Sequence, residues 1–104
     1  MQEAQLIEEL KLFIMENRLP LIDMALFGVL CPLCGKTDRI RELDPPEKLK
    51  ASPASQHPSF NLYIMYWQKC TDQNLIMGVC KFCNSPLKLN IKEMKANLLY
   101  DLNE

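Results

Sequence analysis

The chain has 104 residues, of which 12 are basic and 13 acidic, and its formal net charge is −1. This length fits one domain, and 48% apolar with 24% charged residues is the balance of a globular protein, which excludes disorder of the whole chain. The charge also differs from the strongly basic balance of many nucleic-acid binders. We therefore expect a single domain over residues 1–104.

The first 28 residues are predicted to form a helical N-terminal segment. Apolar residues recur at helical spacing over residues 2–16, which predicts an amphipathic helix. Pro20 can begin a second short helix, which Gly28 would end. The chain start has no basic region before an apolar stretch, and no stretch reaches bilayer length, so we expect neither a signal peptide nor a membrane span.

The central part of the chain is predicted to be a loop followed by a β-hairpin. Residues 44–59 hold four prolines and three serines, a composition typical of a loop. Residues 60–67 alternate between two apolar sets, which predicts a strand, and residues 75–79 are expected to form its partner.

The C-terminal part is predicted to contain a short strand over residues 86–90 and a closing helix over residues 91–102. The helix is expected because apolar residues recur at helical spacing, namely Ile91, Met94, Leu98 and Leu102. The expected fold is therefore α+β, with N-terminal helices, a three-stranded antiparallel sheet and a C-terminal helix.

Four of the five cysteines form two Cys-x-x-Cys pairs, namely Cys31 with Cys34 and Cys80 with Cys83. A tight knuckle can place both thiolates of a pair on one ion, and two knuckles supply the four ligands of a closed tetrahedral Zn²⁺ site. Gly35 and Asn84 follow the pairs, and both residue types tolerate the left-handed backbone that a knuckle needs. The sequence predicts one structural zinc, with iron or a redox-active pair as alternatives.

Little in the sequence favours an enzyme. His57 is the single histidine and lies in the predicted loop, where we expect a solvated side chain. The His-x-Glu arm of a zinc deaminase is missing, and a four-thiolate zinc leaves no open position for a reacting water. Cys70 is interpreted as a packed or partly exposed thiol and not as a fifth ligand.

An apolar surface for a partner is expected on the N-terminal segment and on the predicted strand. The candidate partner-binding residues are Leu21, Ile22, Met24, Leu26, Phe27, Tyr63, Met65 and Trp67. In the alternative interpretation the two predicted helices simply close over the hairpin. The aromatic residues could also stack on bases, but the net charge favours a core position or a protein interface.

Two stretches of the sequence resemble the early zinc-binding oncoproteins of papillomaviruses. Leu19-Pro20-Leu21-Ile22-Asp23 running into Cys31-Pro32-Leu33-Cys34-Gly35 resembles the start of a zinc domain in the larger oncoprotein, and residues 79–89 are similar to the first knuckle of the smaller one. The resemblance covers about residues 5–90. It departs from the family in a longer gap between the cysteine pairs and in having one zinc domain instead of two.

The resemblance implies the zinc-domain fold and the four cysteine ligands. It further implies a non-enzymatic adaptor that captures Leu-rich helical motifs of host proteins, and a dimer like that of the smaller oncoprotein. We therefore expect an intracellular adaptor, similar to a viral early regulatory protein, in a reducing compartment of the cytoplasm or nucleus. The second hypothesis is a zinc-ribbon module of transcription or replication machinery that binds nucleic acid or a polymerase subunit, and the third is a thiol redox protein.

Overall fold

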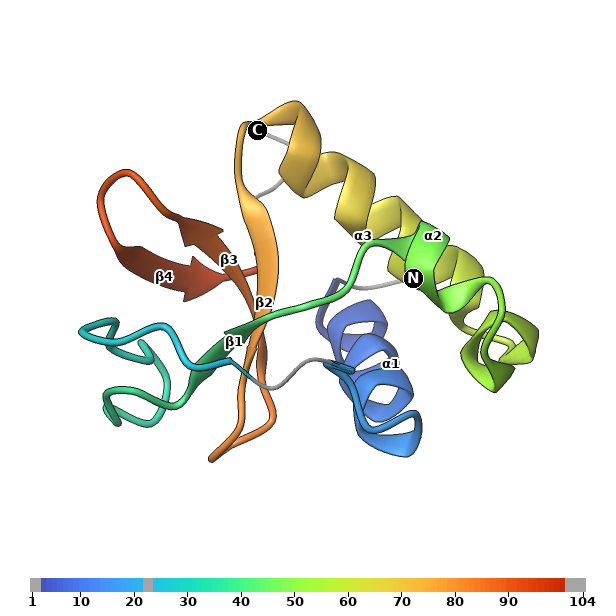
Figure 1. The fold of residues 1–104 in the computed structure, drawn as a ribbon, viewed down its shortest axis with the longest axis horizontal. Coiled ribbons are helices and arrows are strands. Elements are labelled where there is room, and N and C mark those ends of the chain that lie inside the picture. Colours follow the sequence, from blue (N-terminus) through green and yellow to red (C-terminus); the bar gives the residue numbers. More distant parts are fainter. Residues whose placement is uncertain (1–2, 22–23, 101–104) are drawn as a thin grey trace.

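A computed structural model describes residues 3–21 and 24–100 of the chain. Its helical elements are α1 (Glu3–Glu16), α2 (Pro46–Leu49), the 3-10 turn η1 (Pro53–Gln56) and α3 (Phe60–Asp72). Its strands are β1 (Ile40–Glu42), β2 (Ile76–Cys80), β3 (Pro86–Asn90) and β4 (Lys95–Leu98). The strands form one antiparallel sheet in the order β1-β2-β3-β4. The α+β class is thereby confirmed, with α1 and α3 on one side of the sheet (Figure 1).

The helix predicted over residues 2–16 is confirmed as α1 for residues 3–16, and residue 2 lies outside the described residues. Its buried side chains are Leu10, Phe13 and Ile14, which share one face of the helix. The helix ends where Arg18 takes a positive φ of 53° and the Leu19 N–H donates to the Ile14 carbonyl at 3.0 Å. This turn satisfies a carbonyl that the end of a helix would otherwise leave without a partner.

The strand predicted over residues 60–67 is wrong, because these residues form the first part of α3. Its buried side chains are Tyr63, Tyr66 and Cys70, spaced by three and four positions as on a helix face. The apolar run over residues 62–67 is continuous, and such a run fits a strand and a buried helix equally well. Its aromatic residues favoured a strand by propensity, but packing against α1 decides for the helix.

The C-terminal helix predicted over residues 91–102 is also wrong within the described part, and residues 101–102 lie outside it. Residues 91–94 form a turn, in which Met94 has a φ of 53°, and β4 follows. Ile91 and Met94 are exposed turn residues, so their helical spacing does not reflect a buried face. The sheet consequently has four strands instead of the three predicted.

The second N-terminal helix, predicted from Pro20 to Gly28, is not present in the described residues, and residues 22–23 lie outside them. Instead, the chain runs along the outer edge of β1. Ala25 forms an isolated bridge with Arg41, and the Leu26 N–H donates to the Ile40 carbonyl at 2.9 Å. Backbone hydrogen bonds to a strand edge replace those that a helix would have made.

The segment predicted as a loop over residues 44–59 contains both α2 and η1, so it is more ordered than predicted. Pro46 and Pro53 stand at the start of these elements, where proline lacks only an N–H that has no helical partner. Two of the four prolines that indicated a loop therefore mark the starts of short helical turns.

Two hydrophobic clusters lie on opposite faces of the sheet, because successive strand residues point to opposite faces. The helical cluster packs Met77 and Val79 of β2 against side chains of α1 and α3, including Phe13 and Tyr63. The metal-side cluster contains Val29, Cys31, Ile40, Cys80, Leu87, Leu89 and Ala96. The sheet thus separates a helical layer from a layer formed by the cysteine loops.

Candidate metal centre

The four paired cysteines meet in one cluster, with every Sγ within 4.8 Å of the other three. The Cys31 and Cys83 sulfurs are 3.8 Å apart, and the Cys34 and Cys80 sulfurs are 3.7 Å apart. Four sulfurs in a tetrahedron at about 2.3 Å from one metal ion would be separated by about 3.8 Å. A disulfide needs about 2.05 Å, so these distances describe free thiols gathered as a ligand set that can hold one metal ion.

The two knuckles repeat one hydrogen-bond pattern. In each, the N–H four positions after the first cysteine donates to that cysteine's carbonyl, from Gly35 to Cys31 at 2.9 Å and from Asn84 to Cys80 at 2.7 Å. The first cysteine's own N–H donates to the carbonyl five positions onward, at 3.0 and 3.1 Å. Gly35 and Asn84 have positive φ of 76° and 63°, which confirms the left-handed conformation expected at both positions.

Sheet pairing brings the knuckles together across 45 intervening residues. The second knuckle is the turn between β2 and β3, and the first lies between Leu30 and Thr37, which form a bridge just before β1. Because Ile40 of β1 pairs with Cys80 of β2, both knuckles point from the same end of the sheet. Antiparallel pairing therefore positions all four ligands.

The surroundings of the thiols set their protonation in the absence of a metal. Burial raises the pKa of Cys31 above its usual value and raises that of Cys80 to about 12, although N–H groups within each knuckle oppose this effect. Burial acts in the same direction on Cys83, but hydrogen bonds from the Ser85 hydroxyl and N–H outweigh it and bring its pKa to about 7. The Ser85 Oγ lies 3.4 Å from the Cys83 Sγ. This buried serine was not predicted as part of the site, although its place two residues after a ligand was a signal.

We expect metal uptake at neutral pH to release at least two protons, one each from Cys31 and Cys80. Both thiols are protonated at pH 7 without metal, because their pKa values are raised, and only thiolates bind the ion. Apparent affinity should fall about 100-fold or more for each unit of decreasing pH. Titration calorimetry in buffers of different ionisation enthalpy measures the proton count, and a pH-independent affinity would contradict this ligand set.

The donor set fits a structural metal better than a reactive one. Within the described residues the cluster consists of four thiols alone, without a carboxylate or imidazole. Four thiolates complete a tetrahedral site and leave no position for a substrate or an activated water. The cluster is therefore compatible with one structural zinc ion, held by the ligands predicted from the sequence.

Three of the residues predicted to bind a partner come together in a groove. Met24, Leu26 and Trp67 line a groove of about 430 Å³ with Leu43 and Ile76. The remaining candidate residues differ in how exposed they are. Leu21 and Phe27 are exposed, Met65 is half-buried against the helical cluster, and Ile22 lies outside the described residues. Tyr63 is 0% exposed, and its hydroxyl donates to the Asp44 carbonyl, so its place among the surface residues is wrong.

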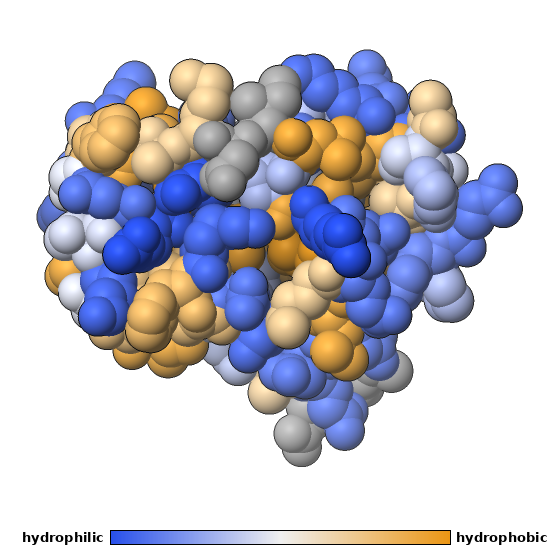
Figure 2. Space-filling view, turned by 60° about the horizontal axis from the view of Figure 1, so that its bottom comes forward, coloured by the Kyte–Doolittle hydropathy of each residue, from blue (hydrophilic) through white to orange (hydrophobic). Residues whose placement is uncertain are grey.

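Exposed apolar side chains also lie at the knuckle tips, which were not among the predicted partner-binding residues. Leu33 and Phe82 hold the same position within their Cys-x-x-Cys pairs, and each is 58% exposed. The Lys36 ammonium of the first knuckle lies 4.8 Å from the centre of the Phe82 ring of the second. In Figure 2 the apolar residues of one face of the molecule form separate patches divided by hydrophilic ones.

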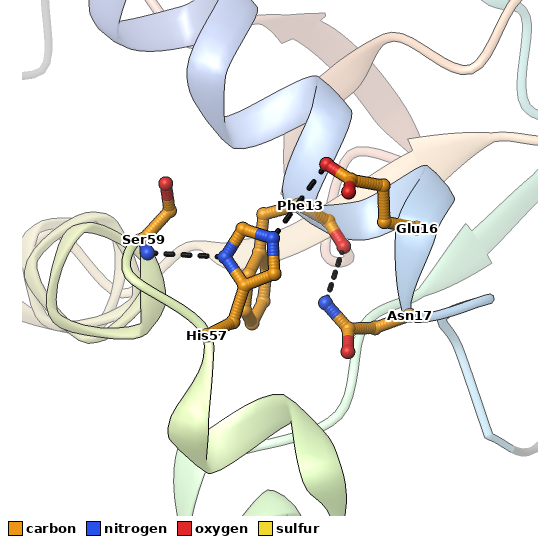
Figure 3. A network of polar contacts seen from close by, with 5 residues as sticks. All are labelled: Phe13, Glu16, Asn17, His57 and Ser59. Atoms are coloured by element: carbon orange, nitrogen blue, oxygen red, sulfur yellow. Dashed lines mark hydrogen bonds and ion pairs between the residues drawn. The ribbon is translucent and has the colours of Figure 1, made fainter.

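His57 is a packed residue and not the solvated loop histidine that we predicted. Figure 3 shows its ring between α1 and the start of α3, with its Nδ1 accepting from the Ser59 N–H at 3.1 Å. Its Nε2 lies 3.6 Å from a Glu16 carboxylate oxygen, and its ring meets that of Phe13 edge-on with centroids 5.1 Å apart. These contacts assign His57 a structural position, joining the segment before α3 to α1.

Cys70 is buried in α3 among the side chains of the helical cluster, in agreement with a packed thiol.

No helix in the described ranges 3–21 and 24–100 is long and apolar enough to cross a membrane. No protein-family model, curated protein or solved structure matches the chain.

Proposed function

We propose that the protein is a non-enzymatic adaptor, stabilised by one structural zinc ion, that binds a partner protein in a reducing intracellular compartment. The observation that carries this proposal is the groove in which Met24, Leu26 and Trp67 meet, away from the closed thiol cluster. The zinc would hold the fold, and the groove would provide the contacts with the partner.

The groove favours a short helical segment with apolar anchors. Met24 is 71% exposed at the rim, and methionine adapts its shape to different partner side chains. Lys48 and Glu42 supply charges of both signs at the wall, which can orient a bound helix. The resemblance to papillomavirus early oncoproteins supports Leu-rich motifs of host proteins as the class of partner.

Trp67 allows a direct test, because it is the single tryptophan of the chain and lines the groove. Titration with an amphipathic, Leu-rich helical peptide is expected to shift its fluorescence emission and to saturate. Met24→Ser should weaken binding at least about fivefold, as truncation of an important interface residue costs more than about 1 kcal/mol.

Leu12→Ser is the matched control, since Leu12 is an exposed apolar residue on α1 that does not line the groove. It should leave peptide affinity unchanged. Absence of a saturable fluorescence change, or equal effects of both substitutions, would reject the groove as the binding site. A metal assay with light scattering determines the zinc count and shows whether two copies associate.

A further inference from the structure

Charge is distributed unevenly between the two layers of the molecule. Residues 24–43 and 76–100, which form the sheet and the knuckles, carry seven of the twelve basic residues and three of the thirteen acidic ones. Zinc with four thiolates would add about two negative charges, which still leaves this half positive. Within the described residues, the helical half (residues 3–21 and 44–75) carries seven acidic and five basic residues. An approaching polyanion is therefore attracted to the knuckle side and repelled from the helical side.

Two basic residues face each other where the strands reach the knuckles. The β1–β2 ladder continues past the Ile40–Cys80 pair, because the Lys81 N–H donates to the Arg39 carbonyl at 2.8 Å. Both side chains are exposed, and neither forms a salt bridge within the described residues. Like charges directly opposite each other destabilise a sheet. A bound anion would remove this cost.

An exposed aromatic ring belongs to the same knuckle as Lys81. Phe82 follows Lys81 directly, and Lys36 approaches its ring from the other knuckle. Asp38 is the acidic residue that precedes Arg39 in the sequence. Its carboxylate accepts a hydrogen bond from the Gly28 N–H at 2.7 Å. An exposed ring beside exposed cations is the combination that binds a stacked base and its phosphates.

We infer that the two knuckle tips together bind single-stranded nucleic acid, with Phe82 stacking on a base and Lys36, Arg39 and Lys81 contacting phosphates. This surface is separate from the groove of the proposed adaptor and does not depend on it. The exposed ring with the Lys36 ammonium 4.8 Å from its centre favours a nucleic acid over an acidic peptide, because stacking rewards a base specifically. The protein would then join a protein partner to a nucleic acid.

The experiment is fluorescence anisotropy of a short labelled oligothymidylate with the purified, metal-containing protein. We expect log affinity to fall linearly with log salt between about 50 and 200 mM, with a slope of about −2 for three phosphate contacts. Phe82→Ala should weaken binding about tenfold or more. Lys36→Ala with Lys81→Ala should reduce the slope by more than one.

A matched control removes two lysines from the helical half, Lys11→Ala with Lys50→Ala, and should leave the slope unchanged. Metal content and circular dichroism verify that each variant is folded. Lack of oligonucleotide binding at about 50 mM salt would overturn the inference. Equal competition by an acidic peptide, with no loss in Phe82→Ala, would overturn it in favour of a charge-only surface. Either result leaves the Trp67 titration of the groove unaffected.

Discussion

Replacing Cys80 with Ala is expected to abolish metal binding and to unfold the domain. Cys80 is buried in the metal-side cluster, and its sulfur lies 3.7 Å from that of Cys34. Structural zinc contributes about 10–16 kcal/mol of apparent binding free energy, whereas a whole domain is stable by only about 5–15 kcal/mol. Far-UV circular dichroism and a zinc assay of the purified variant measure both effects.

Cys70→Ala is the control for this experiment, because it makes the same substitution at a buried cysteine outside the cluster. It should retain one metal ion per chain and a cooperative melting transition. A Cys80→Ala protein that keeps the spectrum and melting temperature of the original would show that the thiol cluster does not stabilise the fold.

Replacing Phe13 with Ala is expected to reduce the free energy of unfolding by about 3–5 kcal/mol. Phe13 is fully buried in α1, and its ring packs against those of His57, Phe60 and Tyr63 at centroid distances of 5.1, 6.3 and 5.1 Å. The substitution leaves a cavity where α1, α3 and the preceding segment meet, and packed neighbours collapse into such a cavity only partly. Urea denaturation followed by circular dichroism gives the change.

The neighbouring substitution Leu12→Ala provides the comparison on the same helix. Leu12 is exposed, so its loss should change stability by no more than about 0.5 kcal/mol. Similar losses for Phe13→Ala and Leu12→Ala would mean that the helical cluster is not the packed core that stabilises this layer.

The ligand set was predictable because a Cys-x-x-Cys knuckle is a local structure. Its turn needs only a few adjacent residues, and Gly35 and Asn84 adopt the left-handed conformation that their residue types indicated. Strands β2 and β3 match the strands predicted over residues 75–79 and 86–90, but β2 pairs with β3 and not with residues 60–67 as predicted. Local sequence patterns identified these elements, because their formation does not depend on contacts with residues distant in the sequence.

The errors arose where distant packing decides the structure. The run around Tyr63 and Trp67 is apolar on every side, so its period alone does not distinguish α3 from a strand. Met24 and Leu26 were predicted on a helix, but β1 offers them an open strand edge. The groove that joins Met24 to Trp67 depends on both of these outcomes, and it could not be derived from local patterns.

The order of the sheet gives the metal a second effect on stability. Strands β1 and β2 are neighbours, yet α2, η1 and α3 lie between them in the chain. The 45 residues between the cysteine pairs therefore form a long loop whose two ends lie side by side. An ion bound to both knuckles cross-links these two ends. A covalent cross-link around 45 residues would lower the conformational entropy of the unfolded chain. This loss would raise the free energy of the unfolded chain by about 4 kcal/mol. A metal ion that stays on the cysteines during unfolding would restrict the denatured chain in the same way.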